Sequence, residues 1–164
     1  MNMSIKKVLA VTGISLIVPG VAFAATETTT FQVTATVASS CSVSAGALDF
    51  GSYDPLAVLD LDATSAVNVT CNLLTPYTVE LDGGLVAGDI SAREMDDGDS
   101  SQLGYQLYTT TLRTTIWGDG TTGSTIAGVG TGLSIPHTVY GRVPNGQNVP
   151  NGSYADTITV SLDF

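Results

Sequence analysis

Apolar and polar residues alternate strictly in a segment near the start of the chain. The apolar positions are Phe31, Val33, Ala35 and Val37, and one polar residue separates each from the next. Successive side chains of a β-strand point to opposite faces, so this spacing places all four apolar side chains on one face. The segment predicts a β-strand without a hairpin partner beside it. Its apolar face therefore needs a cover from another element or another molecule.

The last residues of the chain form a second alternating segment. Its apolar face carries Tyr154, Ile158, Val160, Leu162 and Phe164, while threonine, serine and aspartate occupy the opposite face. Two terminal strands of this kind predict a protein that pairs with copies of itself. The alternative for residues 154–164 is an ordinary core strand that ends at the chain terminus.

The middle of the chain has the pattern of an all-β protein. No helical period of 3.6 residues is sustained, and turn sequences such as Asp82-Gly83 and Asn151-Gly152 recur at short intervals. We predict a glycine-rich loop at 117–133 and strands at residues 41–50, 65–72, 77–82, 103–108, 113–117, 135–143 and 154–164. Short strands without a linker-like tract favour one β-sandwich domain with Greek-key connections.

The first residues have the features of a signal peptide. Lys6 and Lys7 precede an apolar run from 8 to 23, and Ala22-Phe23-Ala24 has the small-x-small pattern of a cleavage site. A retained membrane anchor is the weaker interpretation, because Pro19 interrupts the run and no stop-transfer flank follows it. We predict a signal peptide at 1–24, an N-terminal strand at 25–38 and a single domain at 39–164.

The mature chain is strongly acidic. Removal of residues 1–24 takes away both lysines and changes the formal charge from −10 to about −12, with three arginines against fifteen carboxylates. Such a surface repels phosphate backbones and anionic lipid, so nucleic acid and membrane surfaces are disfavoured as partners. The charge otherwise serves solubility and says little about the fold.

Cys41 and Cys71 are the two cysteines of the chain. An even pair in an exported chain more often forms a structural bridge than a metal site or a nucleophile. We predict a disulfide that joins the first strand of the body to the second.

The sequence offers little for catalysis or metal binding. His137 is the single histidine, so a multi-histidine metal site is not available, nor is a Ser/His/Asp triad with a spare base. Asp96, Asp97 and Asp99 fail the spacing of an EF-hand calcium loop and predict a solvated acidic loop. We predict no catalytic, cofactor or metal site and no enzymatic activity. An exposed subset of the aromatic residues is compatible with sugar binding instead.

Several short motifs together carry a resemblance that spans nearly the whole mature chain. They are Cys41 with Leu48-Asp49-Phe50-Gly51-Ser52-Tyr53, Val69-Thr70-Cys71, Arg93 with Met95, Leu103-Gly104-Tyr105-Gln106-Leu107-Tyr108, Trp117-Gly118-Asp119-Gly120, Tyr140-Gly141-Arg142-Val143-Pro144 with Gln147, and Tyr154 with Asp156-Thr157. In this order and spacing the chain resembles the spore-coat-protein-U-like family. The best-understood members of that family are subunits of archaic, Csu-type chaperone–usher pili.

The resemblance implies an incomplete immunoglobulin-like Greek-key β-sandwich that is completed by a strand from another molecule. A periplasmic chaperone first fills the groove, and an outer-membrane usher exchanges the chaperone strand for the N-terminal strand of the next subunit. The donated face is then Phe31, Val33, Ala35 and Val37. The strand that lines the groove and is recognised by the chaperone carries Ile158, Val160, Leu162 and Phe164.

We therefore predict an exported structural protein, the major subunit of a surface pilus that supports adhesion and biofilm formation. It is predicted to polymerise with copies of itself and not to insert into the membrane after signal removal. A tip adhesin is expected to carry an additional receptor-binding domain and to lack a donor strand, which favours the repeating shaft subunit. An adhesive or carbohydrate-binding module and a spore or cyst coat protein remain alternatives.

Overall fold

The structure, a computed structural model, describes residues 24–164 and is built from β-strands. Residues 24–36 form a unit separate from the body, Val37–Phe164. Within the described range no helix is long and apolar enough to cross a membrane. The strands are β1 (Cys41–Ala45), β2 (Leu61–Cys71), β3 (Pro76–Leu81), β4 (Arg93–Asp96), β5 (Gln102–Tyr108), β6 (Ile126–Val129), β7 (Ser134–Val143) and β8 (Val160–Asp163).

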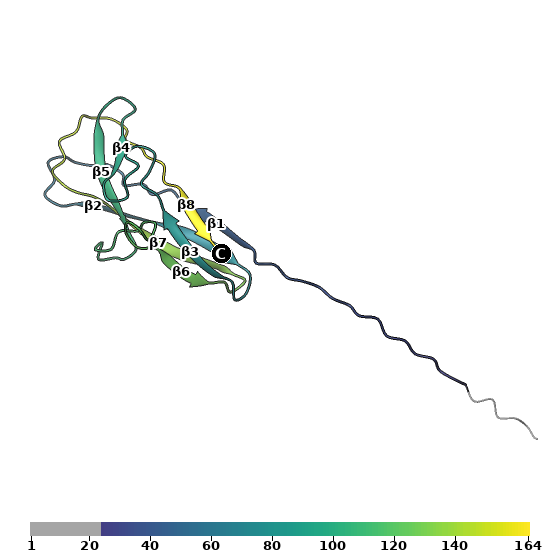
Figure 1. Cartoon of the computed structure of the whole chain (residues 1–164). Coiled ribbons are helices and arrows are strands. Elements are labelled where there is room, and N and C mark those ends of the chain that lie inside the picture. The colour runs from purple at the N-terminus through teal and green to yellow at the C-terminus, as the bar shows by residue number, and fades with distance from the viewer. Residues whose placement is uncertain (1–23) are drawn as a thin grey trace, which may run out of the picture. The chain divides into compact units, whose positions relative to one another are not determined.

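The strands form two sheets, and every pair within them is antiparallel (Figure 1). The larger sheet has the order β1-β2-β7-β5-β4, and the smaller has the order β6-β3-β8. Non-consecutive strands are neighbours in both sheets, which confirms the predicted all-β sandwich and its crossover connections. The predicted strands at 77–82, 103–108 and 135–143 agree with β3, β5 and β7 to within one residue at each end.

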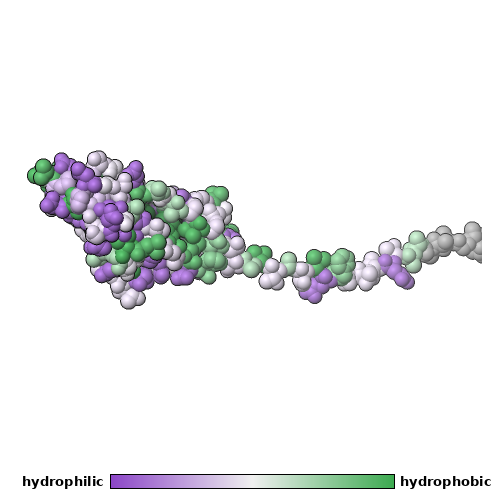
Figure 2. All heavy atoms as spheres, turned by 90° about the horizontal axis from the view of Figure 1, so that it is seen from above, coloured by the Kyte–Doolittle hydropathy of each residue, from purple (hydrophilic) through white to green (hydrophobic). Residues whose placement is uncertain are grey.

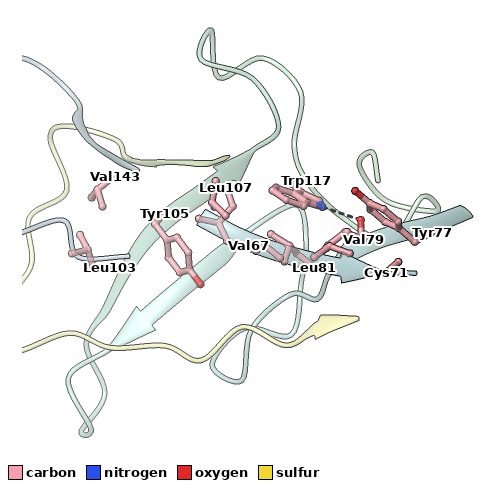
Figure 3. Close-up of a cluster of buried hydrophobic side chains, with 12 residues drawn as sticks. Val67, Cys71, Tyr77, Val79, Leu81, Leu103, Tyr105, Leu107, Trp117 and Val143 are labelled. Carbon is pink, nitrogen blue, oxygen red and sulfur yellow. Dashed lines mark hydrogen bonds between the residues drawn. The ribbon is translucent and has the colours of Figure 1, made fainter. Parts of the chain in front are cut away.

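The core lies between the two sheets. Odd-numbered side chains of β2, β3, β5 and β7 point inward, as the two-residue period of a strand requires. Trp117 is fully buried and donates its indole N–H to the Val79 carbonyl over 3.1 Å, as Figure 3 shows. Val67 and Leu81 face the same interior from opposite sheets. Burial of these side chains provides most of the stabilisation of the domain.

The predicted disulfide is present and joins β1 to β2. Cys41 and Cys71 are bonded, and they are also register partners at one end of the strand pair. β1 has only five residues, and most of its side chains are exposed. The disulfide therefore holds β1 against β2, where side-chain packing contributes little.

Loss of the disulfide destabilises the domain. A Cys41→Ser/Cys71→Ser variant is expected to lose about 3–4 kcal/mol of unfolding free energy, because a crosslink closing a loop of this length restricts the unfolded chain. Urea unfolding of the mature chain, followed by the fluorescence of buried Trp117, measures the change. An unchanged urea midpoint would show that β1 is held by other contacts.

Three features of the strand assignment differ from the sequence prediction. Residues 113–117 do not form a strand: Arg113 has a φ of 53°, and Ile116 and Trp117 make only isolated bridges. β6 lies inside the stretch 117–133 that was predicted as a loop. It pairs with β3, and Gly128 lets the Tyr77 ring approach to 2.4 Å of where a Cβ atom would stand. β4 was also not predicted.

The terminal strands of the body are shorter than predicted. The expected strands at 41–50 and 154–164 are reduced to β1 and β8, and the expected 65–72 begins earlier, at Leu61. Residues 154–159 leave the regular ladder and are held by side-chain hydrogen bonds described below. Residues 46–50 lie outside the ladder apart from the Gly46 amide, which donates to the Ala66 carbonyl over 2.9 Å. The predicted signal peptide falls on residues 1–23, outside the described range, apart from its last residue.

Residues 24–36 carry no assigned strand. Phe31 is 86% exposed and Val33 is 81% exposed. The donor strand predicted for this segment stays a prediction.

Candidate functional site

The two sheets each end in a strand with one unoccupied edge. β1 pairs with β2 alone, and β8 pairs with β3 alone. The two strands are neighbours in the body (Figure 1). Among residues 24–164 no strand pairs with the outer edge of either one. An exposed strand edge offers main-chain donors and acceptors to another strand.

An apolar groove opens beside these edges. A cavity of about 430 Å³ has residues 45–48 on one wall and Ile158 and Val160 on the other, with Val67, Leu81 and Val139 among the core residues beneath. Figure 2 shows apolar side chains gathered on one face of the body. The space is where a further strand of the sandwich would bury its inward side chains.

A second cavity of about 470 Å³ lies next to the groove. The two cavities share the lining residues Leu48, Phe50, Met95 and Tyr154. Leu48 and Phe50 lie over Gly141 of β7, where an added Cβ atom would come within 3.0 Å of both side chains. A glycine at this position lets the wall segment pack directly on the sheet.

Main-chain groups along the β8 side alternate in the direction of their hydrogen bonds. The carbonyls of Thr157 and Thr159 accept from the amides of Leu85 and Asp82 over 3.1 and 3.2 Å. Ile158, between them, makes no main-chain hydrogen bond within residues 24–164. This alternation is the pattern of a strand that is paired along one edge only. The groove edge is thus prepared for an incoming strand.

Carboxylates fix this wall to the neighbouring loop. Asp156 accepts the Tyr105 hydroxyl over 2.6 Å and the Leu85 amide over 2.9 Å. Asp82 accepts the amide of Thr159 over 2.9 Å and that of Gly84 over 3.0 Å. Burial and the hydrogen bond to Asp156 raise the pKa of Tyr105, so its hydroxyl stays protonated and donating.

A buried arginine lies behind the wall. Arg93 is 1% exposed, and it donates from Nε to the Asp82 carbonyl over 2.9 Å and from Nη2 to the Trp117 carbonyl over 2.8 Å. Its Nη1 donates to Gln106 Oε1 over 2.5 Å. Burial lowers the pKa of Arg93, but nearby Tyr105, Asp82 and Asp156 act in the opposite direction. The guanidinium thereby links β4, β5 and the end of β3 beneath the groove.

The hydrogen bonds accepted by the Asp82 carboxylate predict a pH-dependent contribution to the free energy of unfolding. Burial alone raises the pKa of Asp82, but hydrogen bonds from Thr159 and Gly84 and the charge of Arg93 outweigh it and hold the pKa below 3.8. A carboxyl group whose pKa is lower in the folded state than in the unfolded state stabilises the fold at pH values above the unfolded-state pKa. This contribution is lost as the pH falls through the folded-state pKa.

The isosteric Asp82→Asn variant isolates this contribution. At pH 7 the variant is expected to unfold at lower urea concentration than the wild type, because the charge that strengthens the contact is gone. The difference is expected to shrink as the pH falls below 3.8. Urea unfolding at several pH values measures it, and a gap independent of pH would contradict the assignment.

The four residues predicted to line the groove do not all lie in it. Ile158 and Val160 line the groove. Leu162 packs against the core opposite Val79, and Phe164 follows β8 with 59% of its surface exposed. Leu48 and Phe50 lie on the other wall of the groove. The sequence places them in a family motif but does not predict that they line the groove. Their apolar spacing of two was the signal for it.

The other candidate groups play local structural roles. His137 contacts Tyr77 through a 2.9 Å hydrogen bond between Nε2 and the hydroxyl. Asp97 accepts the amides of Asp99 and Ser101 over 3.0 and 3.1 Å, which folds the acidic loop on itself. Within the described residues no group of three His, Cys, Asp or Glu side chains is placed to hold a metal ion.

The architecture defines the class of protein: an immunoglobulin-like β-sandwich with an unfilled groove at one pair of strand edges. The chain belongs to the Spore Coat Protein U domain family, whose model matches residues 27–161. It is 40% identical over 165 residues to Protein U of Myxococcus xanthus, with 92% of each chain covered. The family expectation from the sequence is confirmed.

The fold also matches a solved structure. A chain in the crystal structure of the CsuC–CsuE chaperone–tip adhesion subunit pre-assembly complex, from archaic chaperone–usher Csu pili of Acinetobacter baumannii, superposes with a TM-score of 0.59 at 24% identity. The match covers 79% of this chain and 40% of that one. At this identity the similarity supports the incomplete immunoglobulin-like fold.

Proposed function

We propose that this protein is a structural subunit of a surface fimbria that assembles by donor-strand exchange. The main support for this proposal is an apolar groove beside two unoccupied strand edges. The same chain carries residues 31–37, in which apolar and polar residues alternate. A strand added at an exposed edge gains affinity from main-chain hydrogen bonds and specificity from pockets for alternate side chains. One copy supplies the strand and the next supplies the groove.

The dimensions of the donor segment suit the groove. Residues 31–37 span about 20 Å when extended, as do residues 154–160 along the wall. Burial of Phe31, Val33 and Val37 contributes about 1.5–3 kcal/mol each, with a smaller term for Ala35, which is roughly 5–10 kcal/mol before ordering costs. Main-chain hydrogen bonds to the open edge add about 0.5–1.5 kcal/mol each. An interaction free energy of this magnitude between neighbouring subunits supports a durable fibre.

An uncovered groove makes an isolated subunit prone to aggregation, so a second protein is required before assembly. A periplasmic chaperone that lends a strand fits this need, and the match to a chain of a chaperone–subunit complex supports it. An outer-membrane usher would then exchange the strands. The residues that we assign to chaperone recognition lie on or beside β8: Ile158, Val160, Leu162 and Phe164.

Within the fibre we assign this chain to the repeating shaft. A donor segment and an acceptor groove in the same chain suit a subunit that both gives and receives a strand. The proposed location is the cell surface, reached by export through the periplasm, and the role is mechanical, with adhesion and biofilm formation as its consequences. No step in this role requires a catalytic group or a cofactor.

Co-expression with a periplasmic chaperone and an outer-membrane usher tests the proposal. Electron microscopy compares a mature chain that starts at Ala25 with one that starts at Ser39. Fibres from the first and chaperone-bound monomers from the second are expected. Equal behaviour of the two would show that the segment serves the fold of its own subunit.

A second candidate is a coat component of a spore or cyst. The family description and the 40% identity to Protein U of Myxococcus xanthus favour it. The same strand exchange would serve there, with the polymer laid over the cell instead of projecting from it. Immunogold labelling of intact cells distinguishes fibres from a continuous coat.

A further inference from the structure

The topology of the two sheets defines the two ends of the body between which a donated strand would run. Cys41 pairs with Cys71, and the turn that follows leads into β3, whose Thr78 pairs with Asp163 of β8. The start of β1 and the end of β8 therefore share one end of the body, here called the base end. The opposite end, where Leu61 pairs with Val143, is called the far end.

Antiparallel pairing with β8 places Phe31 of the donated strand near the base end of the acceptor and Val37 near its far end. We choose this direction because every strand pair in the structure is antiparallel and such pairs are slightly the more stable. The body of the donating copy then follows at the far end of the accepting copy. The contact is head-to-tail and propagates into a fibre.

The connection between the two bodies is short. Ser40 is already bound to Asn72 of the body, as the Ser40 amide donates to Asn72 Oδ1 over 2.9 Å and the Asn72 amide donates to the Ser40 carbonyl over 3.0 Å. Three residue steps from Val37 to Ser40 reach about 10 Å at about 3.3 Å per residue. The base end of one copy must therefore lie against the far end of the next.

The base end carries a cluster of exposed apolar side chains, here called the base cluster: Leu73, Leu74 and Leu133. Two turns present it, and they are tied together because the Leu74 amide donates to the Gly130 carbonyl over 2.9 Å and the Gly132 amide donates to the Cys71 carbonyl over 3.0 Å. The cluster contains no charge in a strongly acidic chain.

Both the side-chain exposure and the backbone conformation of Leu74 are energetically unfavourable in an isolated subunit. Its side chain is 75% exposed, and its backbone has a φ of 64°, a left-handed conformation that favours glycine. An exposed leucine held in a strained conformation points to a use for the side chain.

The far end carries a second apolar group, here called the far loop: Leu56, Val58 and Leu59, all strongly exposed. Its backbone is fixed, because Asn145 donates its amide to Asp60 Oδ1 over 3.0 Å and its side chain to the Val58 carbonyl over 2.6 Å. The loop thus holds its apolar side chains outward on a defined support.

We infer that the base cluster of one copy packs against the far loop of the next copy, as a second subunit contact beside the donated strand. The inference rests on the proposed function, because strand donation is what brings the two ends together. Both surfaces are apolar and uncharged at their centres, which allows contact between subunits whose overall charges repel. The contact restricts bending at the short connection.

Photo-crosslinking in assembled fibres tests this contact. p-Benzoylphenylalanine replaces Leu74 in the full mature chain, and a matched variant carries it at Leu112, an exposed leucine of another loop. After irradiation and cleavage at aspartate, mass spectrometry is expected to find the Leu74 probe joined to the peptide that contains residues 55–59 of a second copy. The Leu112 probe is expected not to label that peptide.

The outcomes separate this inference from the proposed function. Fibres in which the Leu74 probe labels other peptides, or none, would overturn the second contact while leaving strand donation intact. Absence of fibres from the unmodified chain would overturn both. A Leu73→Ser/Leu74→Ser variant gives an independent measurement: it is expected to form fibres with a shorter persistence length in electron micrographs, and fibres of unchanged stiffness would contradict the inference.

Discussion

Replacement of Val33 by aspartate is expected to abolish fibre formation. In the proposed join, Val33 enters a groove whose floor includes Val67, Leu81 and Val139. A carboxylate there has no partner among these side chains, and burial of an unpaired charge costs several kcal/mol, about as much as the apolar burial of the whole donated face. The exchange of strands then loses its driving force.

The same substitution is expected to leave chaperone binding unchanged, because the chaperone would occupy the acceptor groove and not the donor segment. Thr34→Asp is the matched control, since its side chain lies on the opposite face of the same strand. Electron microscopy counts the fibres, and co-purification measures chaperone binding. Fibres from Val33→Asp, or their loss in Thr34→Asp, would show that the apolar face of residues 31–37 is not what joins subunits.

Replacement of Arg93 by methionine is expected to lower the free energy of unfolding by about 3–5 kcal/mol. The guanidinium satisfies carbonyl groups of Asp82 and Trp117 as well as the Gln106 side chain. Methionine retains much of the apolar volume but donates no hydrogen bond. The carbonyls of Asp82 and Trp117 then lose their arginine donors, while Gln106 Oε1 keeps only the Leu107 amide as a donor. The loss is larger than for an ordinary surface substitution because water does not reach the site.

Arg142→Met serves as the control for removing a cation. Arg142 forms ion pairs with Asp62 and Asp60 at the surface, at 2.7 and 3.3 Å. Exposed pairs of this kind contribute about 0–1 kcal/mol, so only a small loss is expected. Urea unfolding followed by Trp117 fluorescence compares the two variants. Similar losses from both would mean that Arg93 does not hold the elements beneath the groove together.

The core strands could be predicted from the sequence because their apolar residues repeat every two positions over a long run. In β2, β5 and β7 the alternation matches the inward and outward faces of the sheets. The disulfide was equally predictable, since two cysteines in an exported chain leave one pairing. β4 and β6 were not, because each has four residues and depends on a neighbouring strand for its register.

The groove could be predicted only in part. The family resemblance assigned Ile158 and Val160 to one wall. Residues 154–159, however, are held by the carboxylates of Asp82 and Asp156 and by single main-chain contacts instead of by a continuous ladder. Such contacts join positions about seventy residues apart, which no local pattern reveals. Arg93 shows the same difficulty, since a charged residue is expected at the surface and its burial depends on carbonyls that the fold brings together.

Electron cryo-microscopy of the assembled fibre tests the central claim most directly, because it resolves which strand lies beside β8. We predict that residues 31–37 of a neighbouring copy occupy the groove, antiparallel to β8, with Phe31 toward the end that holds Cys41. A groove filled by residues 31–37 of the same copy, or by no strand at all, would contradict the account.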